Sequence, residues 1–404
     1  MNSQRSQLGL IFATVFINLI GFGIVIPVLP LYAQRFGAGP LVIGFLVSVY
    51  SIAQMIFAPI LGKISDRVGR RPILLLSIAG TAGGFLLMGA AKALPLLFVG
   101  RIIDGITGGN VSTAQAYIAD ITSPEQRSKR MGLIGAAFGL GFIFGPAIGG
   151  VMSRISLSAP FFFAAGLAFF NALLVYFFLP ESLSAEHRGA ARKGPALTQI
   201  LRDSKGGDVQ IVLAAYFFVT IAFSMLTATY PLFVAHRFGY SAMQIGYIFA
   251  GLGLVSALIQ GGMLGALVKI LGDKGLTVLG AVILSAGFLA LPFSSTRFPL
   301  LWMTGAIAVG HSFVAAPLNS LASKSVGTLF QGRVLGAMQS AASFARIIGP
   351  VLGGWLLDID FSRSGSLMGA APYWTGCLIA LVSLVFASRL KSESALLRSQ
   401  SRDK

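Results

Sequence analysis

Residues 94–120 read LPLLFVGRIIDGITGGNVSTAQAYIAD, an apolar stretch that is long enough to cross a bilayer and yet contains Arg101 and Asp104. A spanning helix needs about 20 apolar residues, and a charged residue near its centre costs roughly 2.5 to 3.5 kcal/mol. The two residues are three positions apart, so a helix places them on one face. We therefore expect both side chains to point into a protein interior or a watered cavity and not into lipid.

The rest of the chain has the composition of an integral membrane protein. Of its 404 residues, 55% are hydrophobic and 11% charged, and the mean hydropathy is +0.82. Soluble proteins carry about 25% charged residues. Apolar segments of spanning length can be placed end to end as twelve expected helices. They cover residues 8–32, 41–61, 73–91, 94–119, 131–153, 157–179, 209–234, 243–268, 275–294, 299–323, 334–357 and 371–388.

Basic residues are distributed unevenly between the two sides of these segments. With both termini on one side, that side holds 22 of the 30 Lys and Arg residues, and Arg101 and Arg346 lie within spans. The positive-inside rule then predicts a multi-pass protein of the cell (inner) membrane with cytoplasmic termini. The net charge of +17 reflects this topology and contact with anionic lipid headgroups, so we expect no nucleic-acid partner. The other side holds Arg35, Lys92, Arg154, Arg237, Arg297 and Arg363.

The two halves of the chain repeat one design. Residues 145–150 read GPAIGG and residues 349–354 read GPVLGG, an offset of 204, and the pair Gly62 and Gly69 recurs as Gly265 and Gly272, an offset of 203. Six spans in each half give both copies the same orientation, and such parallel repeats place the substrate site near the midplane between the halves.

The repeat also predicts the domain organisation. Residues 1–179 are expected to form an N-terminal six-helix bundle, and residues 209–404 a C-terminal six-helix bundle with a short cytoplasmic tail. Residues 180–208 have few apolar side chains and are expected to form a flexible cytoplasmic linker.

The loop between the second and third spans carries a specific motif. Residues 62–72 read GKISDRVGRRP, in which an acid stands among basic residues at a fixed distance from two glycines. This loop resembles the signature of the major facilitator superfamily: G, three residues, D, R or K, any residue, G, R, and R or K. The resemblance implies a cytoplasmic gate in which the loop acid engages the positive end of a helix in the other half. The second-half loop has Lys269 where the first has Asp66, so we expect a one-sided gate. The gate residues are Gly62, Asp66, Arg67, Gly69, Arg70, Arg71 and, at the same rim, Asp120.

The fifth span, GLIGAAFGLGFIFGPAIGG at residues 132–150, combines small residues four apart with a proline. Such a pattern predicts a bent helix that packs closely against its neighbours. Packing alone explains the pattern, yet it also resembles the fifth-span signature of exporters in the same superfamily. Residues 101–127 are similar to the tetracycline-efflux type of drug/proton antiporter, which implies proton-coupled export. The residues of this antiporter helix are Gly135, Gly139, Gly145, Pro146, Gly149 and Gly150.

The chain departs from that group at two acidic positions. Asn18 stands in the first span where the group has an acid, and the ninth span carries no charge. A tetracycline-specific function is therefore not favoured, and Asp104 is the acid positioned to carry a proton inside the membrane. A permanent structural ion pair between Arg101 and Asp104 is the alternative.

Other polar residues within spans are candidates for the transport path. His311 is a candidate proton relay near neutral pH, or a hydrogen-bonded packing residue. Arg346 is a candidate for binding an anionic group or neutralising an acid, or for snorkelling. Helix-to-helix hydrogen bonds are the alternative role for the remaining residues. The cavity candidates are Asn18, Gln54, Asn110, Gln115, Tyr117, Tyr230, Gln260, Asn319, Gln339 and Arg346.

These observations predict an all-α polytopic membrane protein with twelve helices in two parallel repeats. The expected function is secondary active transport, proton-coupled efflux of a lipophilic small molecule, with the lipid bilayer, protons and the substrate as partners and a monomeric state. Proton-linked uptake of a metabolite and a non-transporting scaffold or receptor are the alternatives. Separate histidines, a lone Cys377 and the lack of a phosphate-binding loop in the sequence predict no metal, no cofactor and no enzymatic activity.

Overall fold

Every regular element of the described chain is a helix. The computed structural model describes residues 2–183, 208–325, 331–362 and 369–390, and all structural statements concern these residues. Helices are expected because hydrocarbon offers no partner to backbone N–H and C=O groups, whereas a helix pairs them within one segment. Most of the expected linker, residues 184–207, lies outside the described residues.

The chain forms two compact units, one of residues 1–192 and 230–254 and the other of residues 193–229 and 255–404. We call them unit 1 and unit 2. Unit 1 contains α1 (Asn2–Gln34), α2 (Pro40–Val68), α3 (Arg70–Gly89), α4 (Leu94–Ile106), α5 (Asn110–Ile121), α6 (Pro124–Met152), α7 (Ala159–Phe178) and most of α10 (Ala242–Leu258). Unit 2 contains most of α9 (Asp208–Phe238), η2 (Ile259–Met263), α11 (Leu264–Ala290), η3 (Leu291–Phe293), α12 (Arg297–Lys324), α13 (Gln331–Phe361) and α14 (Ala371–Ser388).

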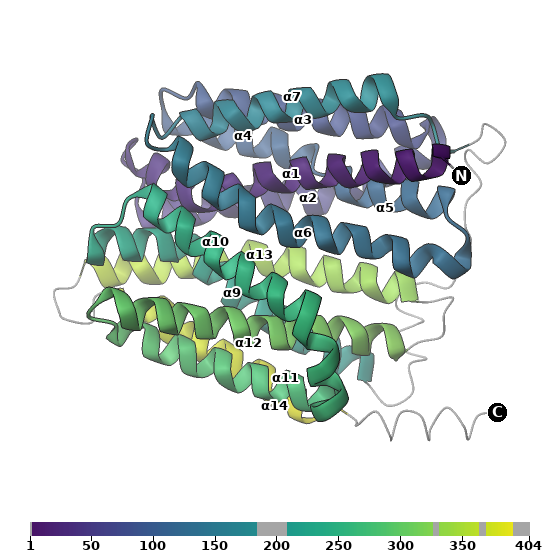
Figure 1. The fold of residues 1–404 in the computed structure, drawn as a ribbon. Coiled ribbons are helices and arrows are strands. Elements are labelled where there is room, and N and C mark those ends of the chain that lie inside the picture. Colours follow the sequence, from purple (N-terminus) through teal and green to yellow (C-terminus); the bar gives the residue numbers. More distant parts are fainter. Residues whose placement is uncertain (1, 184–207, 326–330, 363–368, 391–404) are drawn as a thin grey trace. The chain divides into compact units, whose positions relative to one another are not determined.

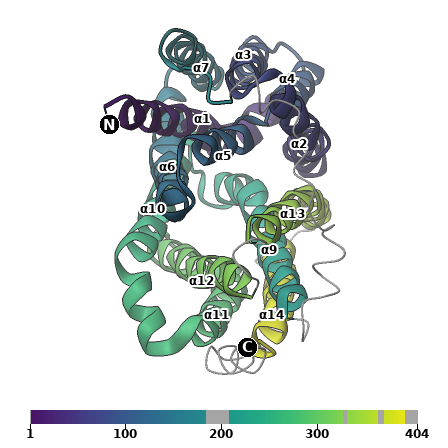
Figure 2. The ribbon, with the colours of Figure 1, turned by 90° about the vertical axis from the view of Figure 1, so that its right-hand side faces the viewer.

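Each unit is a bundle of long helices. In unit 1, α1 packs against both α6 and α7, and α3 packs against both α7 and α4, as Figure 2 shows end-on. In unit 2, α11 packs against α12 and α14, and α13 contacts α12 and α14 (Figure 1). The interior of unit 1 includes a cluster of buried apolar side chains from α1, α3, α5, α6 and α7.

Proline and glycine mark many helix ends. Pro lies at the first or second position of five α-helices, where the missing N–H is one that the helix leaves unpaired anyway. Gly37, Gly69, Gly239 and Gly272 have positive φ angles at the turns between helices, a conformation that side chains other than hydrogen disfavour. The first-turn prolines are Pro40, Pro95, Pro124, Pro160 and Pro372.

Ten helical segments of the described chain are long and apolar enough to cross a membrane. The expected fourth span is divided into α4 and α5 by residues 107–109, so neither part reaches spanning length. The expected eighth and ninth spans join in one helical segment, Ala242–Phe293, with a break in helical geometry at Gly272. The second helix also continues beyond its expected end at residue 61 to Val68, so Gly62 lies inside α2 and the turn is made at Gly69 alone.

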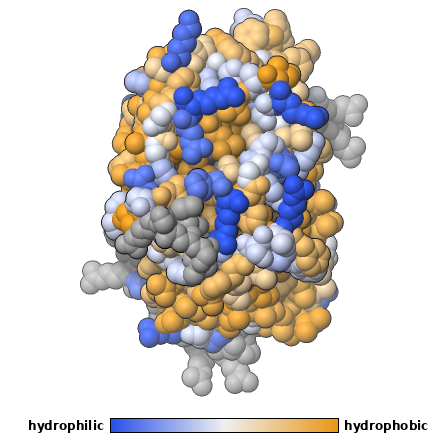
Figure 3. Space-filling view, turned by 90° about the vertical axis from the view of Figure 1, so that its left-hand side faces the viewer, coloured by the Kyte–Doolittle hydropathy of each residue, from blue (hydrophilic) through white to orange (hydrophobic). Residues whose placement is uncertain are grey.

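The outer surface suits a bilayer. Phe169, Phe170 and Phe177 on α7 are more than half exposed, and large apolar side chains are exposed on most other helices. Figure 3 looks at the helix ends opposite the N-terminus: hydrophilic side chains gather on this end, and hydrophobic ones surround them. This distribution is the one expected of a protein that exposes its ends to water and its flanks to lipid.

Candidate functional site

Arg101 and Asp104 form a buried ion pair on α4. Their side chains are 3% and 8% exposed, and Nη1 of Arg101 lies 3.1 Å from Oδ2 of Asp104. The guanidinium also lies over the ring of Tyr50 on α2, with Cζ 4.4 Å from the ring centroid, an arrangement that stabilises a desolvated cation. The pair therefore points into unit 1 as the sequence predicts, and it has an aromatic partner that the sequence pattern did not reveal.

The helix that carries this pair ends immediately after it. Residues 107–109 are Thr-Gly-Gly, and each glycine weakens a helix by about 1 kcal/mol. Gln54 on α2 accommodates the break, because its Nε2 donates to the carbonyl of Gly108 at 3.0 Å and to the hydroxyl of Tyr50 at 3.0 Å. Gln54, expected in the substrate cavity, thus links α2 to the interruption that follows Asp104.

Arg70 is the centre of a charged network at the start of α3. Its Nη1 lies 2.6 Å from Oδ1 of Asp66, and its Nε lies 2.9 Å from Oδ2 of Asp120 at the end of α5. Arg67 is exposed, and the Arg71 guanidinium donates to the carbonyl of Tyr176. The structure thus joins three of the expected gate residues, Asp66, Arg70 and Asp120, which we call the unit 1 triad.

Glu181, which sequence reasoning did not select, caps α3. Its Oε1 accepts from the backbone N–H of Arg70 at 2.8 Å, and its Oε2 accepts from that of Arg71 at 3.1 Å. Gly69, which precedes the helix, has φ of 118° and leaves room for this carboxylate, which a Cβ would overlap. The carboxylate satisfies two unpaired donors and meets the positive end of the helix dipole.

We expect Glu181→Ala to destabilise the protein by about 1 to 2 kcal/mol, because it removes a cap and a favourable charge at a helix N-terminus. Glu181→Gln, which keeps one acceptor, should have a smaller effect. The measurement is thermal unfolding of the purified full-length protein in detergent, with Asp358→Ala as the control, because Asp358 is an exposed acid. Equal melting temperatures for wild type and Glu181→Ala would contradict the capping role.

The α6 helix packs closely along two lines of small residues. Gly141, Gly145 and Gly149 contact α1, and a Cβ on any of them would lie within about 3 Å of α1 atoms. On its other face, Gly150 and Pro146 contact Gly246 of α10. The predicted close approach of this helix is confirmed for Gly145, Pro146, Gly149 and Gly150. Gly135 has open space around it, and Gly139 is half-buried.

Two expected cavity residues of unit 1 belong to its packed interior. Tyr117 is fully buried in the apolar cluster, and its hydroxyl donates to the carbonyl of Pro180 at 2.8 Å. Tyr230 is also fully buried and makes an edge contact with Phe249. Asn110 is buried at the start of α5, and Asn18 and Gln115 are half-buried. Tyr117 and Tyr230 therefore pack in the interior of unit 1, and their role in the substrate path stays a prediction.

The candidates in unit 2 are spread over several helices. The ring of His311 on α12 stacks on Phe223 of α9, with centroids 3.9 Å apart. Arg346 on α13 donates to Oγ of Ser343 at 3.1 Å, and Asn319 donates to the carbonyl of Ala315 at 2.8 Å. Gln260, in the π-helical segment η2, and Gln339 are exposed.

The sequence matches one protein family over nearly its whole length. The family model for the Major Facilitator Superfamily matches residues 11–350 and, in a second match, residues 212–403. The chain belongs to the Major Facilitator Superfamily. It is therefore a multi-pass membrane transporter and not an enzyme, and the predicted family and all-α fold class are confirmed.

Named relatives within the Major Facilitator Superfamily are resistance proteins. The chain is 33% identical over 387 residues to the tetracycline resistance protein, class B, of Escherichia coli, a match that covers 92% of this chain and 93% of the relative. It is 30% identical to multidrug resistance protein 2 of Bacillus subtilis (strain 168), covering 89% and 91%. The fold is similar to that of the human organic anion transporter MFSD10 (TETRAN), with a TM-score of 0.70, 24% identity, and coverage of 95% and 99%.

Proposed function

We propose that the chain is a proton-coupled antiporter that exports a lipophilic, drug-like small molecule by alternating access. The observation that carries the proposal is the buried Arg101 and Asp104 pair, in which an acid sits at mid-span in unit 1. Among the described residues, the other acids lie near the ends of the expected spans, in loops or at the Gly272 break, whereas Asp104 lies within the expected fourth span, residues 94–119.

The pair supplies a means to couple a proton to a conformational change. In the ionised form, the carboxylate of Asp104 is held by Arg101 at 3.1 Å. A proton that reaches the carboxylate cancels its charge and weakens the ion pair, while the ring of Tyr50 continues to hold the guanidinium. Each protonation event thus changes the balance of charge inside unit 1, and a change of this kind is what a proton-driven cycle requires.

The direction and the substrate class rest on the relatives. Proteins that are 30 to 33% identical over most of their length are named for resistance to tetracycline and to multiple drugs, which favours export of a lipophilic molecule. We propose Asn18, Gln54, Asn110, Gln115, Asn319 and Arg346 as polar residues of the substrate path. His311, whose ring stacks on Phe223, is proposed as the proton relay.

The proposed setting is that of an inner-membrane monomer with cytoplasmic termini. The Lys and Arg distribution supports this orientation. On this orientation the unit 1 triad and Glu181 lie at the cytoplasmic ends of α2, α3, α5 and α7, where they stabilise the rim through which substrate would enter.

Proteoliposomes test this function directly. The liposomes contain purified protein and carry a pH gradient, and tetracycline or ethidium is the probe. We expect protons to cross the membrane down their gradient and the probe to cross in the opposite direction, with a proton flux that depends on the probe. Solute movement in the same direction as protons would replace antiport with symport. The lack of any flux for a panel of lipophilic cations, anions and neutral drugs would contradict transport of this class.

A further inference from the structure

The part of α11 that follows Gly272 begins with a buried acid, Asp273, which forms an ion pair with Lys324. Asp273 follows the helix break at Gly272, and its side chain is 2% exposed. Nζ of Lys324, the last residue of α12, lies 2.7 Å from Oδ2 of Asp273, and Oγ of Ser320 lies 3.4 Å from the same atom. A cavity of about 410 Å³ opens beside this point.

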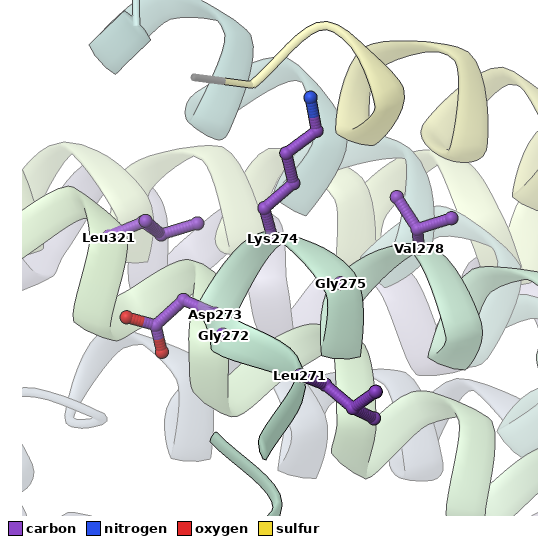
Figure 4. Close-up of a pocket in the computed structure, with 7 residues that line it drawn as sticks. All are labelled: Leu271, Gly272, Asp273, Lys274, Gly275, Val278 and Leu321. Atoms are coloured by element: carbon purple, nitrogen blue, oxygen red, sulfur yellow. The ribbon is translucent and has the colours of Figure 1, made fainter. Parts of the chain in front are cut away.

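Figure 4 shows how the charged residues at this cavity are directed. The Asp273 carboxylate extends toward the side of α12 that carries Leu321, whereas the side chain of the neighbouring Lys274 extends away from that carboxylate. Lys324, one turn after Ser320 on α12, reaches the carboxylate from that side. The ion pair therefore ties the beginning of the α11 segment after Gly272 to the end of α12.

The repeat relates this pair to the unit 1 triad position by position. The offset of 203 that relates Gly69 to Gly272 also relates Arg70 to Asp273, and it relates Asp66 to Lys269. The offset of 204 that holds later in the halves relates Asp120 to Lys324. We call Lys269, Asp273 and Lys324 the unit 2 triad. Its charges are positive, negative, positive, whereas those of the unit 1 triad are negative, positive, negative.

The backbone supports the same correspondence independently of the charges. Gly69 has φ of 118° immediately before Arg70, and Gly272 has φ of 70° immediately before Asp273. In both units the central charge thus follows a left-handed glycine at the start of a helix. In both units, the partner of the central charge lies near the end of the next expected span. The partner is Asp120 near the end of α5 in unit 1 and Lys324 at the end of α12 in unit 2.

We propose that Asp273 and Lys324 are positioning residues of the transport cycle, equivalent to Arg70 and Asp120 with every charge reversed. Each pair holds the start of the third span of its half against the end of the fourth. The predicted one-sided gate concerns contact of Asp66 with a helix of the other half and stays a prediction, whereas the ion pairs described here lie within each unit. The clamp itself does not depend on the proposed antiport, and only its transport readout rests on that function.

A charge swap tests the equivalence. Lys324→Asp places a second acid beside a buried carboxylate, and Asp273→Arg places a second cation beside Lys324, so each should lower the melting temperature and reduce the transport rate by about tenfold. The double variant Asp273→Arg with Lys324→Asp recreates the polarity of Arg70 and Asp120. It should restore both quantities most of the way to wild type.

The readouts separate this clamp from the proposed function. Melting temperature of the full-length protein in detergent is measured for wild type, both single variants, the swap and the neutral pair Asp273→Asn with Lys324→Gln. Tetracycline and ethidium fluxes are measured on the same proteins in liposomes. Lys274→Asp is the matched control, because Lys274 is the adjacent residue and extends away from the pair, and it should leave both quantities near wild type.

A swap variant whose losses equal the combined losses of the single variants would overturn the proposal, as would single variants that melt and transport like wild type. If a single variant cannot be purified but the swap can, the recovery itself supports the pairing. If no protein, wild type included, moves either probe or any member of the drug panel, the antiport function fails, while the pattern of melting temperatures still decides whether the clamp exists.

Discussion

Asp104→Asn is expected to abolish accumulation of substrate against its gradient when a pH gradient drives transport, while exchange of substrate at equal pH continues. Asparagine keeps the shape of the side chain but cannot take up or release a proton, so the cycle loses its coupling and keeps its path. The carboxylate lies 3.1 Å from Arg101 inside unit 1, where no exposed acid can replace it. Proteoliposomes with tetracycline or ethidium as probe measure both modes on one preparation.

Loss of Asp104 also leaves Arg101 without its carboxylate, and an uncompensated buried charge costs roughly 3 to 5 kcal/mol. The double variant Arg101→Gln with Asp104→Asn removes both charges and separates folding from coupling: it should fold like wild type and remain uncoupled. Asp358→Asn is the matched control, since Asp358 is exposed near the end of α13. Accumulation by Asp104→Asn at the wild-type rate would leave the pair as a purely structural element.

Gly246→Val should destabilise the protein by more than about 3 kcal/mol, the upper end of the usual cost of overpacking. A Cβ at residue 246 would lie 2.9 Å from Cα of Gly150 and closer still to the carbonyl oxygen of Pro146. Backbone atoms cannot rotate away as a side chain can, so α6 and α10 must separate. The measurement is the melting temperature and the monodisperse fraction of the full-length protein after extraction into detergent.

Gly251→Val is the control for this substitution, because it lies on the same helix and a Cβ there meets no atom within 4 Å. It should melt within a few degrees of wild type, since a valine in place of glycine costs little where the helix faces open space. Similar melting temperatures for Gly246→Val and Gly251→Val would show that the contact between α6 and α10 does not hold unit 1 together.

Much of the fold was predictable because the bilayer restricts the choices of a chain. Segments of about 20 apolar residues must be helical in lipid, and glycines four apart favour close packing against another helix. These rules anticipated the all-helical fold and the close contacts of Gly145 and Gly149. The length, the span count, the repeat and the motif at residues 62–72 together predicted the superfamily, which the family match confirms.

The features that sequence reasoning missed depend on contacts between distant residues. Glu181 follows the seventh helix, and only the fold brings its carboxylate to the start of α3. Its two signals were an acid near the end of an apolar span and a helix start without a capping side chain. The same holds for Tyr50 beside Arg101, because neither periodicity nor composition encodes a tertiary neighbour.

The two seams of α6 determine how unit 1 can deform. Main-chain atoms of α6 contact main-chain atoms of its neighbours at two places: Gly145 contacts Gly23 of α1, and Gly150 contacts Gly246 of α10. A small slide along either seam drives a main chain into a side chain, and the next matching register is four residues away, about 6 Å along the helix axis. A slide along either seam therefore meets a main-chain clash at Gly145 or Gly150 before the next register is reached, so these contacts oppose gradual shear of α6 against α1 and α10.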